Sequence, residues 1–410
     1  MNTVNRSSFT RADRLANQRV SEILSIGARA TELAQQGHDV IVLGAGEPDF
    51  PTPDHVIEAA NRAARDGQTT YTPLAGTPAL RAAICGKFHR ENGLDYAPAE
   101  VMATAGAKQA IFNAFMATLN AGDEVIIPAP FWTTYSAMVD ICGGTAVALP
   151  CPGETGFKLT PDQLEEAITG RTRWLMLNSP SNPTGAAYDR AELQALVAVL
   201  ERHPHVWLLS DEIYEHITYD GFVATSPATL SPDLRRRCLI VNGVSKAYSM
   251  TGWRLGYAAG PSELISAMTV VQSQSTSNPC SIAQAAAIAA LEGPQDLLAT
   301  RRDSFRARRN MLVGAINAIP GLDCRMPEGA FYAFADCGGL LGARTPQGKV
   351  LHTDRDFCSF LLETAHVAVV PGSAFGVAPY FRLSYATGMQ ELEEAMQRLA
   401  RACGSLERAS

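Results

Sequence analysis

Lysine is scarce in this sequence, so any chemistry that needs an amine has few candidates. Only five lysines occur in the 410 residues, among 34 basic residues in all. Lys246 follows the apolar run CLIVNGVS and precedes a loop rich in hydroxyl and aromatic groups, AYSMTGWRLGY. An apolar setting lowers the pKa of an amine and favours its neutral, nucleophilic form. Lys246 is therefore the candidate nucleophile, and the alternative is a solvated lysine on a loop.

Other polar and aromatic residues stand where apolar strands are expected to end. The runs 101–106, 173–180, 206–212 and 238–246 alternate with longer helical patterns, which predicts parallel strands joined by crossover helices. In open α/β sheets a ligand lies beyond the carboxyl ends of the strands. The residues at those ends are Lys108, Trp132, Asn182, Asp211, Tyr214 and Lys246. We expect a ligand site where they meet.

The C-terminal third has a different pattern. Apolar residues recur every seven positions at Leu298, Phe305, Leu312 and Ile319, which predicts one long helix with a single apolar stripe. The strand-like runs EGAFYAF, VAVVPGSAF and YFRLSYA follow, interrupted and closed by further helical segments. This pattern indicates a smaller α+β unit.

The domain organisation follows from these two patterns. We expect a large domain over residues 48–296 and a small domain over residues 297–410 that begins with the long interdomain helix. Residues 1–47 contain a helix and a strand without a partner in the main sheet, so we assign them to the small domain.

Composition excludes several classes of function. The net charge of −7 has the wrong sign for a nucleic-acid partner, and no apolar run is long enough for a membrane span. The N-terminus lacks the apolar block of a signal peptide. The nine cysteines are scattered without a C-x-x-C pair, so we expect reduced thiols in a cytoplasmic protein and no metal site.

Three familiar catalytic motifs fail on inspection. The glycines at 44–46 lack the third glycine of a dinucleotide fingerprint, because Asp49 stands there. The stretch 342–349 is one residue too long for a phosphate loop, and Ser245 lacks the closing glycine of a hydrolase elbow. Simple dehydrogenase, NTPase and serine-hydrolase functions are therefore disfavoured.

The segment SKAYSMTGWRLGY resembles the cofactor-lysine segment of class I aminotransferases, which are fold-type-I enzymes that use pyridoxal 5′-phosphate (PLP). Seven further segments resemble the family in the same order: GAGEPDF, YTPLAGTPALR, TAGAKQAIFNAF, NSPSNPTGAAY, SDEIYEHITY, PEGAFYAF and YFRLSYA. The resemblance covers almost the whole chain and is greatest to the bacterial aspartate aminotransferases of the gamma subgroup. It implies an α/β fold with a mostly parallel, seven-stranded-type sheet between helices and a smaller α+β domain.

The resemblance also implies a role for each matching residue around the cofactor ring. Lys246 would bind PLP covalently and, once substrate displaces it, move the substrate proton. Asp211 would keep the pyridine nitrogen protonated, whereas an aspartate after a strand is also fairly commonly a helix N-cap. Asn182 and Tyr214 would hydrogen-bond the phenolic oxygen, and Trp132 would stack on the ring. Asn182 and Trp132 would border the substrate as well.

The cofactor phosphate needs donors and positive charge. Gly106-Ala107-Lys108 opens a helix directly after a strand, which leaves backbone N–H groups free for an anion. Arg254 would supply a guanidinium fork and Ser245 a hydroxyl. By resemblance, Tyr71 would reach the phosphate of the neighbouring subunit and have a catalytic part, which predicts a homodimer.

Substrate recognition is expected to depend on two cationic groups. Arg382 matches the family arginine that clamps the substrate α-carboxylate, with the Gly46 backbone closing over it, whereas an isolated arginine is more often in a surface ion pair. Lys108 matches the lysine that faces the side-chain carboxylate, and Ser21 matches a second polar position nearby. We therefore predict ping-pong transfer of an amino group between L-aspartate and 2-oxoglutarate, giving oxaloacetate and L-glutamate.

Departures from the subgroup pattern leave alternatives open. The stretch FWTTY around Trp132, and Val20 and Ile23 beside Ser21, differ from the usual residues, so an aromatic or prephenate aminotransferase stays possible. A PLP-dependent lyase is a third alternative. A transcription regulator built on the same domain is disfavoured, because the 40 or so residues before GAGEPDF leave no room for a DNA-binding module.

Overall fold

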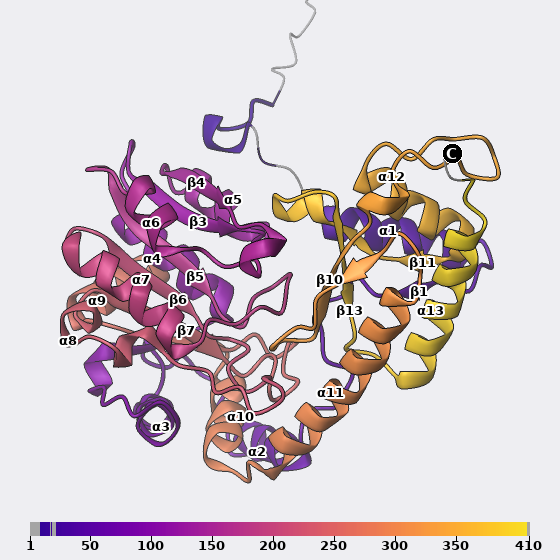
Figure 1. Ribbon diagram of the computed structural model, residues 1–410. Helices are drawn as coiled ribbons and strands as arrows, with labels where there is room; N and C mark the ends of the chain where they lie inside the picture. The colour runs from indigo at the N-terminus through magenta and orange to yellow at the C-terminus, as the bar shows by residue number, and fades with distance from the viewer. Residues whose placement is uncertain (1–8, 17, 19–21, 408–410) are drawn as a thin grey trace, which may run out of the picture.

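A computed structural model describes residues 9–16, 18 and 22–407 of the chain. Figure 1 shows two lobes, with the seven-stranded sheet and its helices in the large lobe and the remaining sheets in the small lobe. The long helix α11 (Asp296–Asn317) leads from the base of the large lobe into the small one. Among the described residues, no helix is long and apolar enough to cross a membrane.

The central sheet of the large lobe has the strand order β2-β8-β7-β6-β5-β3-β4. Only β8 runs antiparallel to its neighbours, so the predicted mostly parallel sheet is confirmed. The strands are β2 (Val101–Thr104), β3 (Glu124–Ala129), β4 (Thr145–Pro150), β5 (Thr172–Asn178), β6 (Trp207–Asp211), β7 (Cys238–Gly243) and β8 (Gly256–Ala259). Strands β2 and β7 are buried along their whole length, as expected for a sheet covered on both faces.

Helices cover both faces of this sheet and each face has its own apolar core. One core contains residues of α4 (Ala107–Thr118), α5 (Thr134–Ile141) and α9 (Ser262–Ser273). The other contains residues of α2 (Asp54–Arg65), α3 (Pro78–Lys87), α6 (Pro161–Ala167), α7 (Arg190–Arg202), α8 (Pro232–Arg235) and α10 (Ser281–Glu292). The sheet is therefore sandwiched between helices, and its functional side chains emerge at the strand ends.

The small lobe contains a four-stranded sheet and a two-stranded sheet. The four strands, in the order β12-β13-β10-β9, are β12 (Val370–Pro371), β13 (Tyr380–Ser384), β10 (Tyr332–Asp336) and β9 (Asp323–Cys324). In the smaller sheet β1 (Ile41–Val42) pairs in parallel with β11 (Val367–Ala368). The helices are α1 (Glu22–Gln35), α11, α12 (Asp354–Phe360) and α13 (Met389–Gly404). The N-terminal strand thus lies against the small lobe, far from the central sheet.

The long helix predicted from the seven-residue repeat is confirmed, and it joins the two cores. Leu298 packs against the large-lobe core, whereas Phe305, Leu312 and Ile319 belong to the small-lobe core. Ile319 lies just beyond the end of the helix at Asn317. One apolar stripe therefore anchors the helix to both lobes.

Short helical segments complete the fold. π-Helical turns extend α3 over Phe88–Asn92 and α12 over Leu361–Ala365. The 3-10 turns are Asp13–Leu15, Pro98–Glu100, Gly153–Thr155, Pro227–Thr229, Gly338–Leu340 and Gly372–Phe375.

Candidate active site

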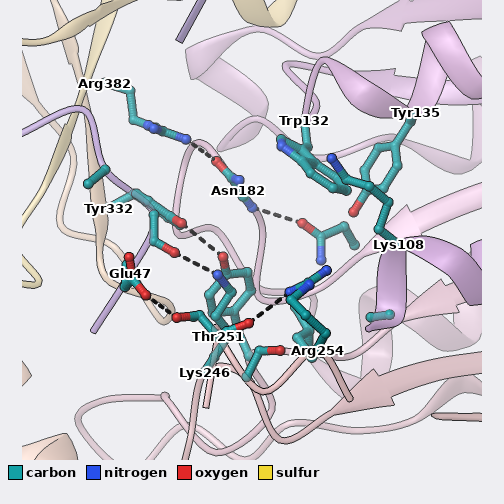
Figure 2. A pocket seen from close by; sticks show the side chains of 17 residues that line it. Glu47, Lys108, Trp132, Tyr135, Asn182, Lys246, Thr251, Arg254, Tyr332 and Arg382 are labelled. Carbon is teal, nitrogen blue, oxygen red and sulfur yellow. Dashed lines mark hydrogen bonds between the residues drawn. The ribbon is translucent and has the colours of Figure 1, made fainter. Parts of the chain in front are cut away.

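A cavity of about 380 Å³ lies where the two lobes meet. Its walls come from the ends of the central strands, from the N-terminal segment 45–47 and from the small-lobe strands β10 and β13. The predicted site residues that line it are Gly46, Ala107, Lys108, Trp132, Asn182, Tyr214, Ser245, Lys246, Arg254 and Arg382. The chain thus brings together residues that are up to several hundred positions apart in sequence (Figure 2).

The other predicted site residues that the structure describes do not line the cavity. Gly106 directly precedes the wall residue Ala107 at the start of α4. Asp211 is buried behind the cavity wall, next to the wall residues Tyr135 and Ile213. Tyr71 is 90% exposed and does not line the cavity of its own chain. Ser21 lies outside the described residues.

Lys246 is half-buried in the cavity wall just after β7. Its Nζ donates a hydrogen bond to the Gly46 carbonyl oxygen at 2.6 Å and lies 5.9 Å from the ring centroids of both Tyr214 and Phe331. Burial lowers the pKa of the amine to about 8, with a smaller lowering from the positive charge of Arg382. A lysine with such a pKa supplies neutral amine near physiological pH. The alternative of a solvated loop lysine is therefore wrong.

Asp211 ends strand β6 and is 4% exposed. The Tyr135 hydroxyl donates to its Oδ2 at 2.7 Å, and the Ile213 backbone N–H donates to its Oδ1 at 3.2 Å. Burial raises the pKa of this carboxyl to about 6 although both hydrogen bonds act in the opposite direction. Residues 213–216 form turns, so the helix N-cap alternative is wrong. A buried carboxylate here favours a cation in the adjacent cavity.

One end of the cavity is built to hold an anion. Gly106 has a φ of 88° and lies directly before α4, whose first backbone N–H groups lack intrahelical partners. A side chain at this position would strike Arg254, because a Cβ would lie 2.6 Å from its Nη2. Arg254 itself donates from Nη1 to the Thr251 carbonyl at 2.9 Å. The glycine therefore permits a guanidinium, a helix N-terminus and the nearby Ser245 to share one corner of the cavity.

Arg382 occupies the opposite end and is 1% exposed. Its Nη1 donates to Asn182 Oδ1 at 2.7 Å and its Nη2 donates to the Gly44 carbonyl at 2.6 Å. The guanidinium lies between two aromatic rings, 4.5 Å from the Tyr332 centroid and 4.9 Å from the Phe375 centroid. Its Nε is buried and has no hydrogen-bond partner in the part of the chain that the structure describes. The alternative of a surface ion pair is wrong, and the buried cation is suited to a carboxylate ligand.

Lys108 and Trp132 form the third part of the wall. The Lys108 Nζ lies 4.6 Å from the Trp132 ring centroid. Burial, with a contribution from Arg254, lowers the pKa of Lys108. Trp132 is half-buried and packs edge-on against Tyr135, so it both faces the cavity and contributes to the adjoining core.

The wall also contains residues that were not identified as functional from the sequence: Ala45, Glu47, Tyr135, Asn178, Ile213, Thr251 and Tyr332. Tyr135 and Tyr332 contact proposed site residues, and Glu47 accepts a hydrogen bond from the Thr251 hydroxyl (Figure 2). Tyr332 and Glu47 lie inside recognised segments, EGAFYAF and GAGEPDF. Their position in those segments was the available signal, but nothing local indicated which atoms they would meet.

Comparison with known proteins identifies the class. The family described as aminotransferase class I and II matches residues 38–399, and the chain belongs to this family. It is 60% identical over 404 residues to the aspartate aminotransferase of Rhizobium meliloti (strain 1021), covering 98% of each chain. It is 56% identical to the aspartate/prephenate aminotransferase of Cereibacter sphaeroides (strain ATCC 17029 / ATH 2.4.9), covering 96% of this chain and 99% of the other.

Solved structures agree with the observed fold. The aspartate aminotransferase of Rhizobium meliloti superposes with a TM-score of 0.96 at 60% identity, and the match covers 98% of this chain and 100% of the other. The Thermus thermophilus aspartate aminotransferase with maleate superposes with a TM-score of 0.89 at 43% identity, covering 96% of this chain and 100% of the other. The chain therefore has the fold-type-I aminotransferase fold.

Enzymes of this family are PLP-dependent, and the residues of the cavity fit that cofactor. The donor set contains the amine of Lys246 with its lowered pKa, the buried carboxylate of Asp211 and an aromatic face at Trp132. Because position 106 is glycine, the Arg254 guanidinium can approach the start of α4, where it and the free backbone N–H groups suit a phosphate. The protein is a PLP-dependent aminotransferase.

Proposed function

We propose that this enzyme transfers an amino group between L-aspartate and 2-oxoglutarate in a reversible ping-pong reaction. The observation that carries the proposal is the placement of the Lys246 amine and the Asp211 carboxylate around one cavity, with Arg382 at its far end. The chain's similarity to aspartate aminotransferases of two bacteria supports the choice of substrate.

The reacting end of the site is assigned to Lys246 and Asp211. When bound, PLP supplies an electron sink for the bond that breaks at the substrate α-carbon. Lys246 binds the cofactor and later carries the proton to and from the α-carbon, for which a pKa of about 8 is suitable. Asp211 holds the pyridine nitrogen protonated, and Tyr135 fixes the direction of its carboxylate. Tyr214 and Asn182 would donate hydrogen bonds to the ring oxygen of the bound cofactor, and Trp132 would hold the ring by stacking.

The phosphate group is assigned to the corner around Gly106. The N–H groups of Gly106, Ala107 and Lys108, the Ser245 hydroxyl and the Arg254 guanidinium are its donors. Tyr71 of the partner subunit is proposed to complete this set. The 90% exposure of Tyr71 in the single chain supports this assignment, which makes the active enzyme a homodimer.

Substrate binding is assigned to the two cationic groups. Arg382 pairs with the α-carboxylate, helped by Asn182 and by the Gly46 backbone, and the free Nε of Arg382 supports this role. Lys108 pairs with the side-chain carboxylate, and Ser21 is proposed as a second polar contact there. The maleate named for the Thermus thermophilus structure is a dicarboxylate, which supports a dicarboxylate substrate.

Two wider features belong to the same proposal. The large domain spans residues 48–296, and the small domain spans residues 1–47 and 297–410, so that the substrate lies between them. The nine free cysteines fit the reducing environment of the cytoplasm, where we place the enzyme.

A second candidate substrate is prephenate. The relative from Cereibacter sphaeroides is named an aspartate/prephenate aminotransferase, and it is 56% identical to this chain. Prephenate also carries two carboxylates, so Lys108 and Arg382 suit it as well.

A panel of amino donors and oxo-acid acceptors with the purified holoenzyme tests the proposal. We expect the highest kcat/KM for aspartate with 2-oxoglutarate, and the K246A variant should lose both transamination and the borohydride-reducible chromophore. K108M should raise the KM for aspartate much more than that for alanine. A preference for phenylalanine over aspartate would refute the dicarboxylate assignment, and turnover of prephenate would establish the second substrate.

A further inference from the structure

Tyr332 begins strand β10 of the small lobe and contacts both Arg382 and Tyr214. It lies diagonally across the strand pair from Arg382, since Phe334 is the residue directly opposite that arginine. Both side chains point to the same face of the sheet, because residues two apart on a strand share a face. The Tyr332 ring is 1% exposed and its centroid lies 4.5 Å from the Arg382 guanidinium carbon.

The hydroxyl of Tyr332 reaches across to the large lobe. Its Oη lies 2.9 Å from the Oη of Tyr214, which is in the loop after β6. Gly46 makes this approach possible, because a Cβ at that position would lie 2.7 Å from the Tyr332 Oη. The two tyrosines are 118 positions apart in sequence.

The number of protons on the two hydroxyls limits which of them can donate and which must accept. Each phenol has one proton to donate and lone pairs that accept. If Tyr214 donates its proton into the cavity, its oxygen must accept the proton of Tyr332. Donation from Tyr332 also polarises Tyr214 and makes it a stronger donor, because hydrogen bonds in a chain reinforce one another.

We propose that Tyr332 is a positioning residue that donates its hydroxyl proton to Tyr214, so that the Tyr214 proton faces the ring oxygen of the cofactor, while its ring supports Arg382. This inference rests on the proposed function of the cavity. It assigns two separable tasks to one side chain, the hydroxyl acting toward the cofactor and the ring toward the substrate carboxylate.

The charged groups that face this pair come from three elements. Arg382 lies on β13 and Asp211 ends β6. Lys246 follows β7, and its Nζ lies 5.9 Å from the Tyr214 ring centroid. A change of Tyr332 to phenylalanine leaves all three in place. Its effect on the cofactor spectrum therefore reports the hydroxyl alone.

The first experiment titrates the absorbance of the bound cofactor against pH in the cofactor-saturated holoenzyme. A hydrogen-bond donor at the ring oxygen favours the more negative form of the bound cofactor, which is the form present at high pH. Weakening that donor therefore raises the pH at which half of the cofactor has changed form, the midpoint of the titration. We expect Y332F to raise it by roughly 0.3–1 pH unit, the equivalent of one hydrogen bond. The KM for aspartate should change less than about threefold, because the ring beneath Arg382 is retained.

The matched control is Y385F. Tyr385 is equally buried in the small-lobe core, and its hydroxyl donates to the Ala330 carbonyl at 3.2 Å, away from the cavity. We expect Y385F to lower the melting temperature as much as Y332F and to leave the midpoint unchanged. Equal shifts in both variants, or no shift in Y332F, would overturn the assignment of the hydroxyl.

Two further variants test the route and the second task. In the Y214F background the Y332F change should add no further shift of the midpoint, and an additive shift would contradict action through Tyr214. Y332L removes the ring, so the KM for aspartate should rise roughly 5- to 30-fold, the equivalent of a buried cation–π contact. An unchanged KM in Y332L would overturn the support of Arg382.

These outcomes are distinct from a failure of the proposed function. Wild-type enzyme that lacks the lysine-dependent chromophore or aspartate turnover would refute the proposed function itself. Wild-type enzyme with both properties, together with a Y332F midpoint equal to its own, would refute only the inference about Tyr332.

Discussion

Replacing Lys246 with methionine should make the cofactor-free protein more stable while abolishing its activity. Burial lowers the pKa of this amine from 10.5 to about 8. Because one pH unit corresponds to about 1.4 kcal/mol, holding the ammonium in the cavity wall costs about 3 kcal/mol at pH 7. The hydrogen bond to the Gly46 carbonyl offsets about 1 kcal/mol of that. The free energy of unfolding of apo K246M should therefore be about 2 kcal/mol higher than that of the wild-type apoprotein.

Urea denaturation of the two apoproteins at several pH values measures this difference. Between pH 8 and 10.5 the unfolded wild-type chain binds more protons at Lys246 than the folded chain, so wild-type stability rises with pH in this window. The advantage of K246M should accordingly shrink as the pH rises from 7 to 9.5. K349M, which replaces a lysine whose side chain is 61% exposed, serves as the control and should show little change. A K246M apoprotein that is less stable than wild type at pH 7, by an amount that does not depend on pH, would show that burial of the Lys246 ammonium does not destabilise the fold.

Three other changes have defined outcomes. D211N is nearly isosteric and should retain the cofactor absorbance but lower kcat by roughly 100-fold or more in a coupled aspartate assay, because the amide cannot stabilise a protonated ring nitrogen; a kcat within a few-fold of wild type would contradict this. R382K keeps the charge but not the planar fork, so the KM for aspartate should rise roughly 10- to 100-fold with an unchanged circular dichroism spectrum. K87M leaves the buried Glu215 carboxylate without its ammonium partner and should lower the free energy of unfolding by about 3–5 kcal/mol, measured in urea, with K87M/E215Q recovering part of the loss. Equal stabilities of K87M and wild type would show that the pair is not a folding determinant.

The Lys87–Glu215 pair also illustrates what burial requires of charged groups. Lys87 is fully buried, and Glu215 accepts hydrogen bonds from Asn242 at 2.6 Å and from Asn92 at 2.8 Å. Although burial acts in the opposite direction, the Lys87 ammonium and these bonds lower the pKa of Glu215 to about 2. These hydrogen bonds and the ion pair connect α3 to the loop that carries Tyr214 and to strand β7, which precedes Lys246. The network therefore helps to hold two segments of the active site in place.

Much of the site could be predicted from the sequence because the relevant signals are local. A polar residue directly after an apolar strand, as at Asp211 and Lys246, is visible in a window of ten residues. Parallel strands bring their carboxyl ends to one edge of the sheet, so the meeting of these residues followed from the alternating pattern. The order of the recognised segments then supplied the class of chemistry.

Other features depended on contacts that no local pattern encodes. Arg382 meets Asn182 across 200 positions of sequence, and Tyr214 meets Tyr332 across 118. Periodicity places a side chain on one face of a strand, but which lobe packs on that face depends on the closure of the whole chain. The exposure of Tyr71 is also not encoded by a local pattern, because whether a second copy of the chain covers it depends on assembly.

The reactive groups, the alternation that builds the central sheet and the family of the chain could all be inferred from the order of the residues. The folded chain was needed to show that Lys246 donates to the Gly46 carbonyl, that Tyr135 supports Asp211 and that Arg382 lies between two aromatic rings. A side chain's type is a local property, whereas its desolvation, its pKa and its hydrogen-bond partners arise from atoms that packing brings together from distant segments.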